Sequence, residues 1–264
     1  MLVELAGITG AILLKHAVLR RLLCCCSSQA RLRYRYRYKR FSKSYCTKVR
    51  DLNEKEQQEV VNRLMLFVAP STMVVLSVAS LYSSDAFQDP QSRWASSDGP
   101  TTAGEWAGLI LASFMIYELV LYAAYGKGLA FWVHHVVALT ISLNWLVLRI
   151  GTFWGCVVLL TEATTPCLVG TRMMKDSGWT KEPVYKLCVA CFWLCWLAVR
   201  IAWLLAMLSL FCRDLLFGLP EHVPLYFVAV NGLSVLGLLV LSCVWFVPIT
   251  RIFYQVMTGK SRQR

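Results

Sequence analysis

The sequence predicts an all-α fold, a polytopic bundle of transmembrane helices. Hydrophobic residues make up 57% of its 264 residues, a larger share than water-soluble domains carry. They are concentrated in blocks of about 20 residues, the length at which a helix rising ~1.5 Å per residue crosses a bilayer. Polar or charged bridges separate most of these blocks, so the chain is expected to cross the membrane several times.

Seven apolar blocks are expected to form spans, the first of them weaker than the rest. The first block lies near residues 2–19. Six stronger blocks follow near 62–82, 103–123, 129–149, 152–171, 184–212 and 225–250. We therefore expect a signal-anchor-like segment with a basic stretch over 1–54, a transmembrane domain over 55–255 and a short basic tail over 256–264. The patterns "GEWAG" and "GTFWG" predict places where helices pack closely.

Basic residues predict the orientation of the spans. The bridge after the first block is rich in Arg and Lys, whereas the next bridge carries Asp85, Asp89 and Asp98 against Arg93. This alternation continues along the chain, and basic loops face the cytosol. The C-terminus is therefore expected in the cytosol, and the N-terminus outside it if the first block spans the membrane.

The stretch "RLRYRYRYKR" (31–40) has two interpretations. Aromatic residues among arginines suit single-stranded nucleic acid, but a polybasic segment beside a membrane helix is attracted to anionic lipid headgroups. Tyrosine also suits the membrane interface. We expect contact with anionic headgroups and no nucleic-acid partner. Cys24, Cys25 and Cys26 lie at the membrane edge and are candidates for palmitoylation.

Two further alternatives concern processing and metal binding. No acidic residue occurs between Glu4 and Asp51, as in a mitochondrial presequence, although a signal anchor fits the first block better. Cys188, Cys191 and Cys195 share one helix face, and "CVAC" (188–191) resembles half of a metal knuckle, but no second cysteine pair has matching spacing. No metal and no bound cofactor are predicted.

Polar residues inside apolar spans are costly and are therefore candidates for function. Blocks 103–123 and 129–149 are joined by the short bridge "AYGKG" and must be antiparallel neighbours. This places Glu118, His134 and His135 at a similar depth below the cytosolic face. The three residues are predicted to form a proton-handling site and are the catalytic candidates.

Helix geometry separates the two histidines. Consecutive residues point about 100° apart, so one ring is expected to do chemistry while the other binds or orients. His135 and Ser142 share a face, and the two rings are not expected to chelate one metal ion. A purely structural role for the histidine pair is the alternative.

A second polar group is expected near mid-membrane, where Glu162 and Arg200 fall. Pro166 cannot donate to the carbonyl of Glu162, which predicts an irregular helix beside that carboxylate. The alternatives for this pair are mutual neutralisation and, as a third functional hypothesis, ion or proton transport. No transporter repeat is visible in the sequence.

"YEL" (117–119), "WVHHVVALT" (132–140) and "LLTEATTP" (159–166), with Arg172 soon after, resemble the TLC domain. Ceramide synthases, translocating-chain-associated membrane proteins and smaller TLC-domain-containing proteins share this domain. The resemblance covers about 55–255 and implies that Glu162, Arg200, Ser142 and Arg172 contribute polar groups to a lipid pocket.

The resemblance implies two functions. In ceramide synthases the histidine pair, here His134 and His135, transfers an acyl group from acyl-CoA to a sphingoid base. This chain has Glu162 where those enzymes carry a further Asp, and its "EATTP" is more similar to the smaller TLC-domain-containing proteins. We therefore expect a protein of membrane lipid homeostasis that binds an acyl chain or lipid. An acyl-CoA-dependent N-acyltransferase is the alternative. The resemblance implies the endoplasmic reticulum or another endomembrane, with plasma membrane, mitochondrion and oligomerisation left open.

Overall fold

The computed structural model describes residues 54–95, 102–126 and 128–259, with side chains from residue 61 onward. The weak first span, the basic stretch and the tail beyond residue 259 lie outside the described residues. The described part is helical and contains no strand. Its elements are α3 (Glu54–Tyr82), η1 (Asp85–Phe87), α4 (Pro90–Arg93), α5 (Ala103–Tyr125), α6 (Leu129–Leu148), α7 (Thr152–Leu159), η2 (Leu160–Ala163), α8 (Thr164–Asp176), α9 (Pro183–Cys195), η3 (Trp196–Ala202), α10 (Trp203–Phe217) and α11 (Leu225–Thr258).

Within the described residues, six helical segments are long and apolar enough to cross a membrane, which confirms the predicted polytopic bundle. They are Val61–Tyr82, Ala103–Tyr125, Leu129–Leu148, Thr152–Asp176, Pro183–Phe217 and Leu225–Thr258. Four helices extend well beyond the predicted spans. α3 begins at Glu54, and α8, α10 and α11 continue to Asp176, Phe217 and Thr258. At the start of α3, polar residues with good helix propensity continue the helix.

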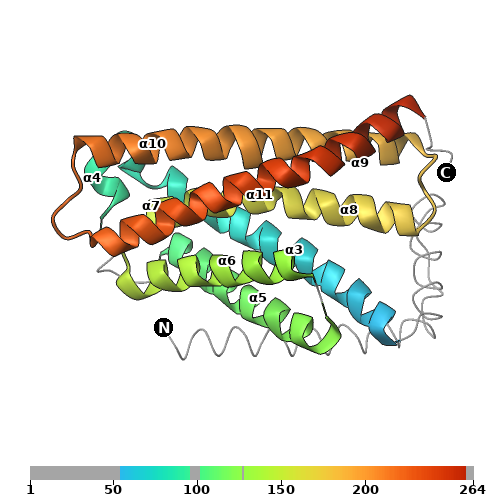
Figure 1. Ribbon diagram of the computed structural model, residues 1–264, viewed down its shortest axis with the longest axis horizontal. Helices are drawn as coiled ribbons and strands as arrows, with labels where there is room; N and C mark the ends of the chain where they lie inside the picture. Colours follow the sequence, from blue (N-terminus) through green and yellow to red (C-terminus); the bar gives the residue numbers. More distant parts are fainter. Residues whose placement is uncertain (1–53, 96–101, 127, 260–264) are drawn as a thin grey trace.

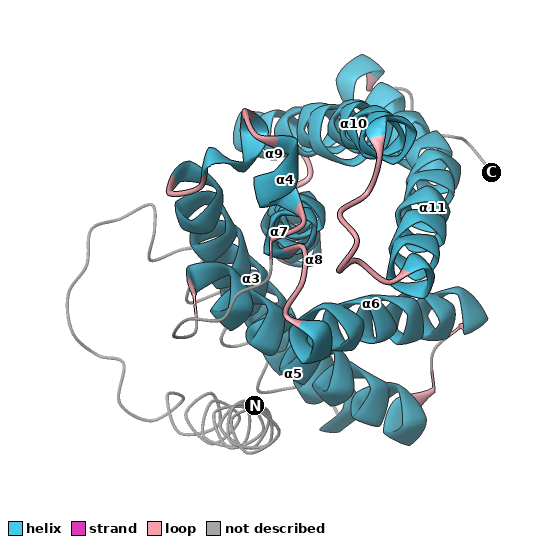
Figure 2. Cartoon of the chain, turned by 90° about the vertical axis from the view of Figure 1, so that its left-hand side faces the viewer, coloured by secondary structure: helices cyan, strands magenta, loops and turns pink. Residues whose placement is uncertain are grey.

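Five of the six spans form a ring around the sixth. Viewed along the bundle in Figure 2, α3, α5, α6, α11 and the α9–α10 span surround α7 and α8. The long helices cross at moderate angles in Figure 1, and the end bearing α4 lies opposite the end of α8. We call the α4 end the predicted luminal end, following the basic-residue pattern. Side chains that point inward from the ring therefore meet those of the central span.

A short segment with the buried side chains of Arg93 and Trp94 closes the predicted luminal end. Arg93 is 1% exposed and donates to the carbonyls of Ala86 and Phe87. It also pairs with Asp214 on α10. The neighbouring Trp94 is 2% exposed and packs on aromatic rings of α7 and α10. This segment fixes the ring at one end.

Two irregular turns lie at mid-bundle. The central span tightens into the 3₁₀ turn η2 between α7 and α8. This turn contains Glu162 and ends three residues before Pro166, which interrupts the normal hydrogen-bond pattern. The predicted irregularity is therefore present. The α9–α10 span widens into the π-helical turn η3, which carries Arg200. Such turns occur frequently at functional sites.

Candidate functional site

The α5–α6 hairpin brings a carboxylate and an imidazole together. Gly126 ends α5 with a positive φ of 70°, and α6 starts after Gly128, so the two helices run back along each other. Oε2 of Glu118 lies 2.6 Å from Nε2 of His135. Both side chains are buried, at 3% and 7% exposure. Glu118 was predicted to lie near the two histidines, and in the structure it contacts His135 directly.

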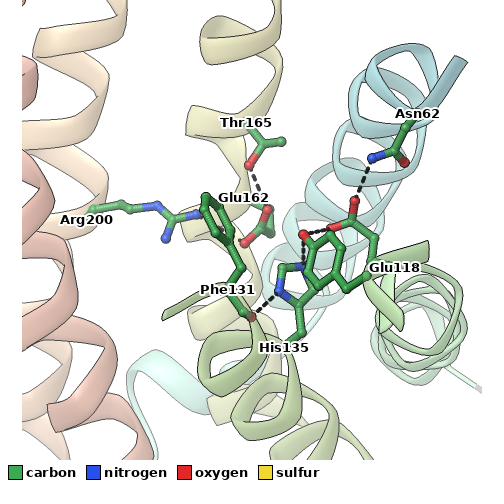
Figure 3. A network of polar contacts seen from close by, with 8 residues as sticks. Asn62, Glu118, Phe131, His135, Glu162, Thr165 and Arg200 are labelled. Atoms are coloured by element: carbon green, nitrogen blue, oxygen red, sulfur yellow. Dashed lines mark hydrogen bonds and ion pairs between the residues drawn. The ribbon is translucent and has the colours of Figure 1, made fainter. Parts of the chain in front are cut away.

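The hydrogen bonds of His135 define what the pair can do with a proton. Nδ1 lies 2.8 Å from the carbonyl oxygen of Phe131 (Figure 3), and a carbonyl only accepts, so Nδ1 carries a hydrogen. Nε2 therefore contacts the carboxyl group of Glu118 with one proton shared between the two groups. The pair has no net charge, which keeps the cost of burial low.

Two further donors surround the carboxylate. Nδ2 of Asn62 on α3 donates to Oε1 of Glu118 at 3.0 Å. The hydroxyl of Tyr122 donates to Oε2 at 3.1 Å and lies 3.3 Å from Nε2 of His135. A carboxylate with three donors is strongly held. Both nitrogens of His135 are occupied, so this ring is in a positioning role.

A second cluster joins the central span to the π-helical turn. Nη2 of Arg200 lies 3.2 Å from Oε1 of Glu162, and its Nε donates to Oγ1 of Thr164 at 2.9 Å. Thr165 donates to the other oxygen of Glu162 at 2.8 Å. The guanidinium also lies 4.9 Å from the centre of the Trp196 ring. Figure 3 shows Arg200 reaching Glu162 on the side away from Glu118.

His134 points away from the carboxylate that holds its neighbour. Its ring contacts the His135 ring at 5.1 Å and the Trp245 ring on α11 at 5.7 Å between centroids. Nδ1 of His134 is buried and has no hydrogen-bond partner. The predicted division between two faces is therefore present, and His134 is the histidine with a free ring nitrogen.

A narrow cavity, here called the slot, runs between α5, α6, α7, η2 and α11. Its volume is about 40 Å³. Its polar lining comes from His134, Ser142, Thr161 and Glu162. The apolar lining is Leu111, Met115, Ala138, Ile141, Trp145, Gly155, Val158, Leu159 and Leu238.

The slot is too small to hold a lipid chain in this structure. Its volume is enough for about three water molecules, whereas pockets that bind small molecules measure roughly 300–1,000 Å³. Occupation by a larger ligand requires lining side chains to move. Met115 and Leu238 are flexible side chains at this position.

Ser142 and Arg172 differ in their relation to this site. Ser142 is fully buried and lines the slot with His134 rather than His135. Seven residues fall about 20° short of two helical turns, which rotates Ser142 from the face of His135 toward that of His134. Its hydroxyl donates a hydrogen bond to the carbonyl oxygen of Ala138 at 2.7 Å. Arg172 is exposed on α8 and does not line the slot.

Several site residues were absent from the sequence-based prediction. Tyr122 follows Glu118 by four positions and Thr165 follows Glu162 by three, so helical spacing was a usable signal for both. Asn62 and Thr164 meet their partners from other helices, and no spacing in the sequence connects them. Among the described residues, no group of three His, Cys, Asp or Glu side chains is placed to hold a metal ion.

Comparison with known families agrees with the architecture. A family model described as the TLC domain matches residues 59–251. The chain belongs to the TLC-domain family. A search of curated proteins found no significant match. The TLC domain of this protein thus contains five of the described spans and most of the sixth, with the two polar clusters and the slot. The protein is an integral, multi-pass membrane protein.

Proposed function

We propose that this TLC-domain protein binds a single acyl chain in the slot and acts in membrane lipid homeostasis. The observation that carries the proposal is the polarity of the slot along its length. Glu162 and His134 lie at one end, and the lining at the other end consists of Trp145 and Gly155. A chain with one polar group matches this gradient.

The polar end favours an uncharged polar group. The charge of Arg200 is already matched by Glu162 at 3.2 Å, and the pair formed by Glu118 and His135 has no net charge. A phosphate in this position would have no excess positive charge to meet it. An ester, amide or hydroxyl can instead bind to the free Nδ1 of His134.

The length of the slot also supports a lipid chain. His134 and Trp145 are eleven positions apart on α6, which corresponds to about 16 Å at ~1.5 Å per residue. Half of a hydrocarbon core of ~30 Å is about 15 Å. The residues that line the slot therefore extend over a depth similar to that of the acyl layer of one leaflet.

Lipid analysis of the purified protein tests this proposal. We expect an acyl lipid to remain bound in mild detergent and to be detected by native mass spectrometry. Ala138→Phe fills the slot from α6 and should remove the lipid, whereas Ala130→Phe, on an exposed position of the same helix, should retain it. The proposal is wrong if no lipid is bound, or if both variants bind it equally.

Acyl transfer is the second candidate, and the free nitrogen of His134 favours it. In that reaction His134 would accept a proton from the attacking amine while the thioester releases CoA as its thiol, and the new bond is an amide. His135, held by Glu118, would position its neighbour. Acyl-CoA is the co-substrate and the cytosolic leaflet the expected side of entry.

Incubation with labelled acyl-CoA and sphingoid bases separates the two candidates. Amide formation that is lost in His134→Ala and weakened in His135→Ala would establish the enzyme. Bound lipid without turnover would support lipid homeostasis alone. An endoplasmic reticulum or other endomembrane location belongs to the same proposal, and imaging a tagged full-length chain tests it.

A further inference from the structure

We infer that Trp145 is the floor of the slot and sets the length of the acyl chain that the protein accepts. This inference rests on the proposed lipid-binding function. Trp145 is 2% exposed and lines the slot at the end opposite His134. Its position near the end of α6 places it close to the predicted luminal face.

Two glycines clamp the Trp145 ring. A Cβ atom added at Gly155 on α7 would lie 2.5 Å from Cδ2 of the ring. A Cβ added at Gly108 on α5 would lie 2.9 Å from Cζ3. Both distances are below what real Cβ contacts allow, so the ring occupies a gap that exists because both positions are glycine. The indole is fixed between α5 and α7.

A hydrogen bond fixes the remaining freedom of the ring. Nε1 of Trp145 donates to Oγ1 of Thr152 at 3.3 Å. A buried indole usually needs such a partner. The ring is thus confined by both glycine positions and at its nitrogen, unlike Met115 and Leu238 elsewhere in the lining. Side chains of the latter kind can yield to a ligand, and a clamped ring does not.

The packing beyond Trp145 explains why a chain must stop there. Phe153, Trp154 and Trp94 lie toward the predicted luminal end and belong, together with Trp145, to the main core cluster. Trp154 packs on Phe153 and Phe211 with centroid distances of 5.0 and 5.2 Å. No lining residue of the slot comes from this aromatic group. Trp145 therefore separates the slot from solid core.

Trp145→Leu should lengthen the slot and Gly155→Ala should shorten it. Leucine removes the indole, and because a vacated site collapses only in part, the bound chains should become longer by about two to four carbons. A methyl at Gly155, which lines the slot beside the Trp145 ring, takes up space at this end, and the bound chains should become shorter. A general loosening of the bundle would not lengthen the bound chains in one variant and shorten them in the other.

Trp154→Leu is the matched control. Trp154 is also a buried tryptophan of the same domain, at 7% exposure, but it does not line the slot. Each protein is purified with its bound lipid, and chain lengths are read by native and lipid mass spectrometry. Thermal unfolding of each variant is measured in parallel. If Trp145→Leu does not fold, the expected shortening in Gly155→Ala still tests the inference.

The outcomes separate this inference from the proposed function. Longer chains in Trp145→Leu with unchanged chains in Trp154→Leu support Trp145 as the floor. Lipid bound with the same chain lengths in Trp145→Leu, Gly155→Ala and the unchanged protein overturns the inference and leaves the proposed function in place. An equal shift in both tryptophan variants also overturns it. Absence of bound lipid from the unchanged protein overturns the proposed function itself.

Discussion

Removing the carboxylate of Glu118 should destabilise the bundle far more than neutralising it. Glu118→Ala leaves Nε2 of His135 without its hydrogen-bond partner in the interior. It also leaves Asn62 and Tyr122 without their acceptor. Loss of one partner of a buried pair costs about 3–5 kcal/mol. The ratio of folded to unfolded protein should therefore fall by more than about 100-fold.

Glu118→Gln should cost much less. Its carbonyl still accepts from Asn62, and its amide donates to Nε2 of His135, which is an acceptor because Nδ1 holds the ring hydrogen. Because charge-assisted hydrogen bonds become neutral ones, the free energy of unfolding should fall by about 1 kcal/mol. The Glu118→Ala/His135→Ala double variant should cost less than the sum of the two single variants by about 1–3 kcal/mol.

Unfolding in mixed micelles measures these differences. Tryptophan fluorescence reports the transition as denaturing detergent is added, and the unchanged protein and the four variants are compared under identical conditions. The shared-proton interpretation fails if Glu118→Gln is as unstable as Glu118→Ala. It also fails if the two single variants are additive, because uncoupled residues do not share a proton.

Further predictions concern packing at glycine positions, the Arg93–Asp214 pair at the predicted luminal end and the basic stretch. Gly155→Ala should lower the free energy of unfolding by about 1–3 kcal/mol because it overpacks the core. At Gly170 an added Cβ meets nothing within 4 Å, so Gly170→Ala should stabilise its helix by about 0.5–1 kcal/mol. Equal effects of the two variants on thermal unfolding would contradict this prediction. Asp214→Ala should destabilise by about 3–5 kcal/mol because it leaves Arg93 buried and unpaired, and near-unchanged stability would refute the buried pair. A fragment spanning 20–60 should bind anionic liposomes and dissociate in high salt; binding that ignores salt and lipid charge would refute the electrostatic interpretation.

Hydrophobic block length determined the six spans from sequence alone. A helix in lipid must satisfy its own backbone, so a 20-residue apolar block has few other structures available. The short α5–α6 bridge likewise determined that Glu118 and the histidines would lie at one depth. The 100° step between neighbours determined that His134 and His135 would face different targets, as they do.

Only the tertiary structure decided which histidine the carboxylate holds and what lines the slot. Asn62 reaches Glu118 across 56 positions, and Arg200 reaches Thr164 across 36. Such contacts depend on the rotation and tilt of each helix, which the packing of many side chains fixes together. The glycine clamp around Trp145 belongs to the same class, since it needs α5, α6 and α7 to meet at one point. Sequence periodicity acts within a helix, and the distances between helices are set by the whole bundle.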